Sequence, residues 1–168
     1  MEDISKRILS LVNTSSDFIE LNSILRLFNP FDVLNINEVE IRHSNFLAWL
    51  MDPNENHEIH ESFLRHLLID FVTKHNKLDI YSFDKLNNSN LAKTDVFREY
   101  KIPNGKSIDL LIICIEIETV ILIENKINSK EHSHQLSDYL AFVRSKYPGF
   151  SILPVYLTLF GDEPSEKE

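Results

Sequence analysis

The sequence predicts an α/β protein in which helices precede three strands, and a further helix and strand follow. Three observations support this order. Apolar residues recur at helical spacing in Glu38–Met51. Two short runs rich in Ile and Leu, Ile108–Ile115 and Val120–Ile123, flank a polar segment and predict a buried β-hairpin. An amphipathic stretch at Glu131–Lys146 and an apolar run at Ser151–Leu159 complete the pattern.

Length and composition are those of one globular domain. The chain has 168 residues, of which 43% are hydrophobic, with three Gly and six Pro. Its single cysteine, Cys114, excludes an internal disulfide and is expected to be a small buried residue. No stretch is long and apolar enough to span a membrane, and the N-terminus lacks the pattern of a secretion signal. We therefore expect a cytoplasmic protein with no membrane partner.

The helical region before the strands divides at turn signals. Residues 2–28 predict one or two amphipathic helices that end at Asn29–Asp32. The helix Glu38–Met51 is expected to bury a side made of several apolar residues, and a second helix is expected from about Glu58 to Lys74. The predicted buried side of the first of these helices contains Ile41, Phe46, Leu47, Leu50 and Met51.

The segment between the helices and the hairpin is polar and rich in asparagine. Residues 76–95 predict a connecting loop, with a short strand at Ile80–Phe83. Val96–Ile102 alternates as a strand does, and Pro103–Lys106 predicts a turn that leads into the hairpin. On the last strand, Pro154 predicts an edge position or a bulge.

Three charged residues lie within the apolar hairpin. Asp109 is on its first strand, and Glu124 and Lys126 are on its second, where alternation gives them a common face. Charges in a buried strand are costly unless they are paired or hold a metal. Two carboxylates, a backbone carbonyl such as that of Asn125 and water suit a hard cation such as Mg²⁺ or Mn²⁺. The alternative is a hairpin with incidental charges near its ends.

The spacing Asp-(x)14-Glu-x-Lys resembles the core motif of the PD-(D/E)xK nuclease superfamily. This chain has Ile108-Asp109 where the motif has Pro-Asp, which leaves the acid in place. The resemblance implies a restriction-endonuclease-like mixed β-sheet flanked by helices. It also implies a Mg²⁺-dependent nuclease that hydrolyses DNA with inversion at phosphorus. In that reading Asp109 and Glu124 hold the metal and Lys126 orients or activates the attacking water.

A second block extends the resemblance to the helical region. Residues 40–68 are similar to the opening of a bacterial PD-(D/E)xK subfamily, in which a His-Ser-x-Phe-Leu-x-x-Leu helix precedes an Asp-Pro turn and a loop with a histidine. Members often have glycines after that histidine, where this chain has Glu58-Ile59-His60. The superfamily commonly supplies an acid from this helix, and Glu40 is the first choice here, with Glu38 as the alternative. His43 is expected to line the cleft.

The helix after the hairpin carries a further similarity. Gln135 and Tyr139 are four residues apart and share a helix face, as in superfamily branches where a Gln-x-x-x-Tyr pair borders the active site. The resemblance covers roughly residues 38–160. It divides a single nuclease-like domain into an N-terminal helical extension (1–37), a core (38–160) and a tail (161–168), and it suggests a truncated or minimal member.

Two classes of function stay open. A metal-dependent nuclease acting on DNA is the first, with an RNA-cleaving or defence-associated variant within the same class. The second is a non-catalytic interaction or scaffold module that keeps the fold, which the net charge of −9 favours because phosphate binding usually needs a basic surface. The oligomeric state is not predicted, and a homodimer is one alternative. The histidines are expected to be polar surface or loop residues, because they lack the spacing of a zinc site.

Overall fold

The computed structural model describes residues 15–16, 20, 30–74, 83–127 and 135–158. The chain forms two compact units, Met1–Ile36 and Asn37–Glu168. In the first unit, α3 is a single helical turn at Pro30–Val33. The helices predicted for residues 2–28 fall almost wholly outside the described residues.

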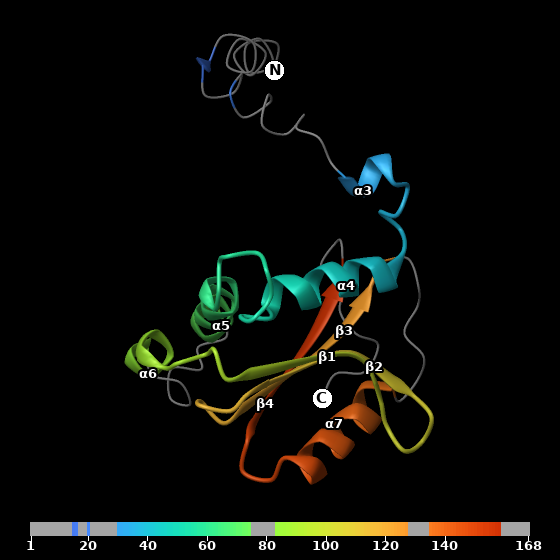
Figure 1. The fold of residues 1–168 in the computed structure, drawn as a ribbon. Coiled ribbons are helices and arrows are strands. Elements are labelled where there is room, and N and C mark those ends of the chain that lie inside the picture. Colours follow the sequence, from blue (N-terminus) through green and yellow to red (C-terminus); the bar gives the residue numbers. More distant parts are fainter. Residues whose placement is uncertain (1–14, 17–19, 21–29, 75–82, 128–134, 159–168) are drawn as a thin grey trace, which may run out of the picture. The chain divides into compact units, whose positions relative to one another are not determined.

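The second unit has a four-stranded mixed sheet with helices on both faces (Figure 1). The strand order is β1-β2-β3-β4; β2 pairs antiparallel with both β1 and β3, and β4 pairs parallel with β3. This confirms the predicted α/β fold class and its order of elements. The elements are α4 (Glu40–Met51), α5 (Ser62–Lys74), α6 (Phe83–Asn88), β1 (Thr94–Lys101), β2 (Ser107–Cys114), β3 (Thr119–Lys126), α7 (Gln135–Lys146) and β4 (Ser151–Thr158).

The predicted hairpin is the centre of the sheet. β2 and β3 pair from Cys114↔Thr119 to Leu110↔Ile123, and a four-residue connection at 115–118 joins them. The turn between β1 and β2 is closed by Gly105, whose φ of 85° suits a residue without a Cβ. Among the described strands β4 lies at an edge of the sheet, so the predicted edge position of Pro154 is confirmed.

Side-chain alternation in β2 and β3 produces two cores, one on each face of the sheet. Leu110, Ile112 and Ile121 pack with α4 and α5 in the α4 core. Leu111 and Leu122, among others, pack with α7 in the α7 core. Figure 1 shows α4 and α5 on one side of the sheet and α7 on the other.

The buried side of α4 agrees with the prediction at Met51 and Leu47 and differs from it at Ile41 and Phe46. Ile41 and Phe46 are 48% and 43% exposed, whereas Ser44, Ala48 and Met51 are buried against the sheet. The three buried residues follow one helical stripe at intervals of four and three residues. Small side chains at two of these positions let the helix backbone approach the end of β3, and a count of apolar residues alone misses this arrangement.

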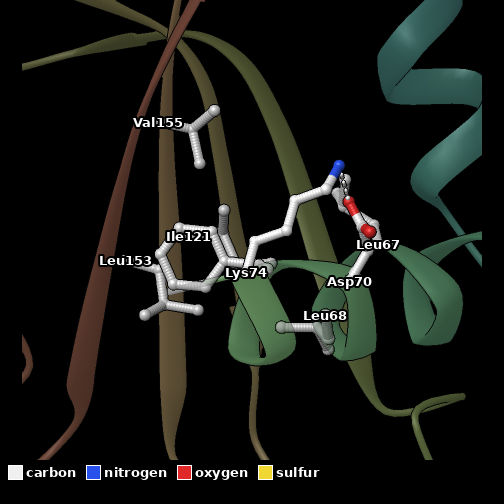
Figure 2. A pocket seen from close by; sticks show the side chains of 8 residues that line it. Leu67, Leu68, Asp70, Lys74, Ile121, Leu153 and Val155 are labelled. Atoms are coloured by element: carbon white, nitrogen blue, oxygen red, sulfur yellow. Dashed lines mark ion pairs between the residues drawn. The ribbon is translucent and has the colours of Figure 1, made fainter. Parts of the chain in front are cut away.

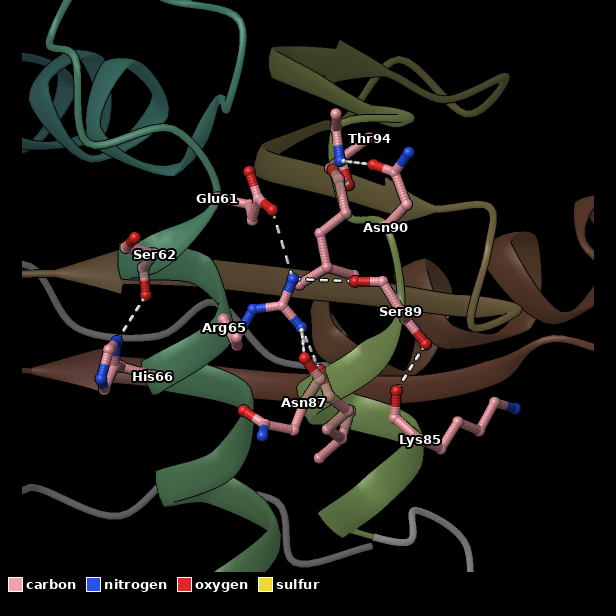
Figure 3. Close-up of polar contacts among 12 residues, drawn as sticks. Glu61, Ser62, Arg65, His66, Lys85, Asn87, Ser89, Asn90 and Thr94 are labelled. Atoms are coloured by element: carbon pink, nitrogen blue, oxygen red, sulfur yellow. Dashed lines mark hydrogen bonds and ion pairs between the residues drawn. The ribbon is translucent and has the colours of Figure 1, made fainter.

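The polar segment after α5 contains a helix, α6, where the sequence predicted a loop. Residues 75–82 lie outside the described residues, so the strand predicted at Ile80–Phe83 can be judged only at Phe83, which begins α6. Arg65 of α5 donates hydrogen bonds to the carbonyls of Leu86, Asn87 and Ser89 at the end of α6 (Figure 3). These contacts satisfy carbonyls that a helix terminus leaves free, so α6 depends on a partner distant in sequence.

A small apolar cavity of about 120 Å³ lies between α5 and the strands β3 and β4 (Figure 2). Leu68, Phe71 and Leu153 are among its walls, and an ion pair between Asp70 and Lys74 at 2.7 Å lies beside them. The charged residues of the hairpin do not line it. Within the described ranges, no helix has the length and apolar character needed to cross a membrane.

Candidate active site

Asp109 lies where the sheet ladder is interrupted. Pairing between β2 and β3 stops at Leu110↔Ile123, and two residues further along β3 the backbone N–H of Asn125 donates to Asp109 Oδ2 at 2.7 Å. A side-chain carboxylate therefore takes the place of a ladder carbonyl. The β1–β2 register also has no pair between Glu99 and Asp109, and Glu99 has a φ of 47°, which is rare for a residue with a side chain.

Glu124 and Lys126 share the face of β3 that α7 covers. Glu124 is only 2% exposed, and its Oε1 lies 2.7 Å from Lys126 Nζ. Gln135 Nε2 donates to the same Oε1 at 2.7 Å and also lies 2.7 Å from the hydroxyl of Tyr139. That hydroxyl donates to the carbonyl of Ser107 at the start of β2. The first turns of α7 thus fix one oxygen of Glu124.

Two buried oxygens of this cluster have no hydrogen-bond partner in the described part of the chain: Glu124 Oε2 and Gln135 Oε1. A buried acceptor without a partner costs about 1–3 kcal/mol, so native proteins rarely leave one without a reason. Both are oxygen atoms, the ligand type that hard cations and their bound waters prefer. The unpartnered oxygen of Glu124, with Asp109 close by, is therefore the position at which a divalent cation fits.

The donor set suits Mg²⁺ better than zinc. The described residues contain no group of three or more His, Cys, Asp or Glu side chains placed to hold a metal ion. Mg²⁺ needs only one or two carboxylates and keeps several waters, so Asp109 and Glu124 with the Asn125 carbonyl meet its requirement.

Helix α4 is attached to the same end of β3. The carboxylate of Glu40 accepts the N–H of Ile127 at 2.9 Å. The side-chain amide of Asn125 donates to the backbone carbonyl of Glu40 at 3.1 Å and to the hydroxyl of Ser44 at 3.2 Å. Glu40 therefore lies at this end of the sheet, with one oxygen bound to backbone.

The remaining sequence candidates are placed as follows. Gln135 and Tyr139 face the cluster, as described above. The ring of His43 lies 2.7 Å from the backbone carbonyl of Asn37, just before the start of α4. Glu38 precedes α4. The sequence predicted a role only for the backbone carbonyl of Asn125, as a metal ligand, and no role for Ser107. No local pattern predicts that an amide on the opposite face of β3 binds α4.

The electrostatics of the cluster follow from burial. Burial raises the pKa of Glu124 to about 7; the hydrogen bond with Lys126 opposes this rise, and the negative charge of Asp109 adds to it. Burial also raises the pKa of Asp109, against the Asn125 N–H and Lys126, which lower it. The charges of Glu99 and Glu40 add to the rise. The two acids therefore hold protons more tightly than isolated carboxyls do.

Lys126 and Tyr139 both keep their protons at neutral pH. Burial alone would lower the pKa of Lys126, but its hydrogen bond to Glu124 and the surrounding carboxylates raise it above the ordinary value. Burial raises the pKa of Tyr139 to about 12. The protonated lysine can orient a water or neutralise charge on a phosphoryl oxygen, but it is a poor base in this state.

Comparison with known protein families agrees with this geometry. The family model described as the PD-(D/E)XK nuclease superfamily matches residues 28–168. No curated protein and no solved structure gave a significant match. The matched region includes β2, β3 and α7 with every charged residue of the cluster. The chain therefore belongs to the PD-(D/E)XK nuclease superfamily.

Proposed function

We propose that this protein is a metal-dependent nuclease that hydrolyses phosphodiester bonds in DNA. Membership of the superfamily supports a nuclease-type activity in general. The observation that carries the proposal for this chain is the unpartnered Oε2 of Glu124. It is buried beside Asp109 and Lys126, and these are the residue types that a metal-assisted hydrolysis requires.

Each residue of the cluster has a distinct role in the proposal. Asp109 and Glu124, with the backbone carbonyl of Asn125, would hold Mg²⁺ or Mn²⁺. The bound ion supplies Lewis-acid stabilisation of a phosphoryl oxygen and a water of lowered pKa. Lys126 orients that water and offsets negative charge in the transition state. Water adds to phosphorus and releases a proton to solvent, the bond to the leaving oxygen breaks, and the leaving oxygen takes up a proton from solvent.

The supporting residues act through their neighbours. Gln135 holds Glu124 Oε1, which would leave Oε2 available for the ion, and Tyr139 fixes Gln135. Glu40 braces the backbone at Ile127 and can reach the metal through water. His43 is proposed to border the cleft. The proposed nuclease-like domain would comprise residues 1–168, with an extension at 1–37, a core at 38–160 and a tail at 161–168. The lone cysteine fits a cytoplasmic location.

A non-catalytic scaffold is the second candidate, and the net charge of −9 favours it. An RNA-cleaving or defence-associated enzyme is a variant of the first. A scaffold has no need of a buried, unpartnered carboxylate oxygen, so the geometry of Glu124 favours an enzyme.

The test incubates the protein with plasmid, linear duplex, single-stranded DNA and RNA, with Mg²⁺, Mn²⁺ or EDTA. We expect cleavage of DNA that needs the cation and is lost in Lys126→Ala. Lys74→Ala is the matched control, because that lysine forms an exposed ion pair on α5. Absence of cleavage under every condition would favour the scaffold, and cleavage of RNA alone would replace the proposed substrate.

A further inference from the structure

A cluster of aromatic rings lies on β1, on α7 and directly after the end of α7, outside the charged site. We call Phe97, Tyr100, Phe142 and Tyr147 the aromatic platform. The rings of Phe97 and Tyr100 meet edge to face, with centroids 5.6 Å apart, and those of Tyr100 and Phe142 are 6.1 Å apart. Lys146 Nζ lies 4.7 Å from the Tyr100 centroid, 5.5 Å from that of Tyr147 and 5.8 Å from that of Phe142. Lys146 also donates a hydrogen bond to the Tyr100 hydroxyl.

The backbone conformation of Glu99 brings two rings of the platform, Phe97 and Tyr100, to the same face of the sheet. In a regular strand, Phe97 and Tyr100 would point to opposite faces, because they are three residues apart. Glu99, with a left-handed φ of 47°, lies between them, and the alternation of side chains along β1 is interrupted at this residue. Val96 packs against the α4 core, whereas Tyr100 packs against the α7 core. Such a conformation persists only where the surroundings impose it, and it is often found near functional sites.

The same step in the ladder positions Asp109. Glu99 and Asp109 are the residues left without a pair between Arg98↔Leu110 and Tyr100↔Ile108. One distortion therefore frees the Asp109 carboxylate for the end of β3 and turns the Tyr100 ring toward α7. The platform and the charged site share this local backbone feature.

The platform is also connected to the site along α7. This helix begins with Gln135 and Tyr139, which contact Glu124 directly or through one another. Phe142 follows Tyr139 by three residues, and Lys146 follows Phe142 by one turn. From Gln135 to Lys146 the helix rises by roughly 16 Å, which a few nucleotides of an extended strand can span.

The chemistry of the platform matches an unstacked base. Phe97 is 39% exposed, and Lys146 is exposed at the edge of the rings. A cation over one aromatic ring is a common surface contact. Here the exposed ammonium of Lys146 lies close to three rings, and the ring of Phe97 is accessible beside them. Aromatic faces bind bases by stacking, and a lysine supplies the positive charge that a phosphate needs, on a chain whose net charge is −9.

We propose that the aromatic platform and Lys146 bind a single-stranded segment of nucleic acid next to the scissile phosphate. This proposal rests on the proposed function and narrows its substrate class. Bases within a duplex are already stacked on their neighbours and cannot lie on Phe97 or Tyr100. The platform therefore selects single strands, overhangs or frayed ends over blunt duplex.

Binding of short fluorescent oligonucleotides tests the proposal. The probes are single-stranded DNA, single-stranded RNA and a blunt DNA duplex, read by anisotropy with EDTA present to prevent cleavage. We expect Phe97→Ser and Lys146→Met each to weaken single-strand binding by about tenfold, with little change for duplex. Phe46→Ser is the control, since Phe46 is 43% exposed on α4, on the other side of the sheet, and contacts Trp49. Thermal melting verifies that every variant folds.

The outcomes separate this proposal from the proposed function. Single-strand binding that falls no more in Phe97→Ser than in Phe46→Ser would overturn the platform, as would an equal loss for duplex. If the DNA or the RNA probe alone responds, the platform stands and its strand type is identified. Cleavage assays with Mg²⁺ are read independently: a wild type that binds single strands through Phe97 but cuts nothing would contradict the nuclease and not the platform.

Discussion

The last residues of β3 lie on two faces of the sheet, and the faces differ in how fully their buried polar groups are hydrogen-bonded. On the α4 face, the amide of Asn125 donates to Ser44 and to the backbone of Glu40, and the residue is 3% exposed. On the α7 face, Glu124 is equally buried, yet its Oε2 lacks a hydrogen-bond partner in the described part of the chain. The two residues are adjacent in sequence and belong to the same strand.

This difference indicates a structural role for Asn125 on the α4 face and a ligand-binding role for Glu124 on the α7 face. A buried polar group whose donors are used fixes the position of its neighbours and has no capacity for a ligand. A buried acceptor with an unused oxygen raises the free energy of the folded state without metal. Binding of a cation to that oxygen stabilises the folded state. The α4 face therefore holds β3 in place, whereas the α7 face carries the oxygen that we propose binds the cation.

The largest expected effect concerns Lys126 on the α7 face. Lys126→Met should lower DNA cleavage by a factor on the order of 10²–10³, because it removes a charge that acts mainly in the transition state. Metal affinity should change little, since the lysine does not bind the ion. Cleavage rates and metal titrations of the same preparation measure both. Undiminished cleavage by this variant would remove the role assigned to Lys126.

The second expected effect is a pH dependence of folding stability that arises from Glu124 on the α7 face. The pKa of Glu124 is raised from 4.5 to about 7, so between these values the folded state binds more protons than the unfolded state. Stability contributed by Glu124 is therefore complete below about pH 4.5 and is lost as pH rises through about 7, by up to about 3 kcal/mol.

Comparison of urea unfolding of wild type and Glu124→Gln from pH 4.5 to 8 isolates this effect. The difference between the two proteins should change with pH in metal-free buffer and should flatten in saturating Mg²⁺, which binds the deprotonated carboxylate. A difference independent of pH would mean that Glu124 is not perturbed by its burial.

The α4 face should respond in stability and not in chemistry. Asn125→Ala leaves the Ser44 hydroxyl and the Glu40 carbonyl without their donor, which should cost on the order of 1–3 kcal/mol of unfolding free energy. Metal binding by the folded fraction should persist, because the backbone of Asn125 and both acids remain. Chemical denaturation and isothermal titration check the two parts. Loss of metal binding at full stability would reverse the roles of the two faces.

The smallest expected effect lies in the loop that follows α4. Glu58 and His60 have φ values of 60° and 48°, a region that costs a residue with a Cβ roughly 1–2 kcal/mol. Glycine relieves this strain but adds entropy to the unfolded chain, so Glu58→Gly and His60→Gly should each stabilise the fold by about 0.5 kcal/mol. Cleavage should not change. Destabilisation by both substitutions would show that these side chains do more than connect α4 to α5.

The sequence predicted the parts of the site that depend on local alternation. The common face of Glu124 and Lys126 follows from the period of a strand, and the spacing of Gln135 and Tyr139 follows from a helix turn. In the loop after His57, Glu58 and His60 adopt positive φ values, which glycine takes more readily than other residues.

The parts that the sequence did not predict depend on contacts between distant elements. Helix α6 is capped by Arg65 from another helix, and α4 approaches the sheet through Ser44 instead of Phe46. The interruption of the ladder at Glu99 likewise arises from two paired strands together. Propensity in a single segment contains no information about such partners.

The most direct test of the central claim is the melting temperature with and without divalent cation. Mg²⁺ or Mn²⁺ well above its dissociation constant should raise the melting temperature of the wild type by about 5–10 °C. Glu124→Gln and Asp109→Asn should lose most of this shift, while Glu116→Gln, an exposed acid in the hairpin connection, should keep it. An equal shift in all four proteins would contradict a metal site between Asp109 and Glu124.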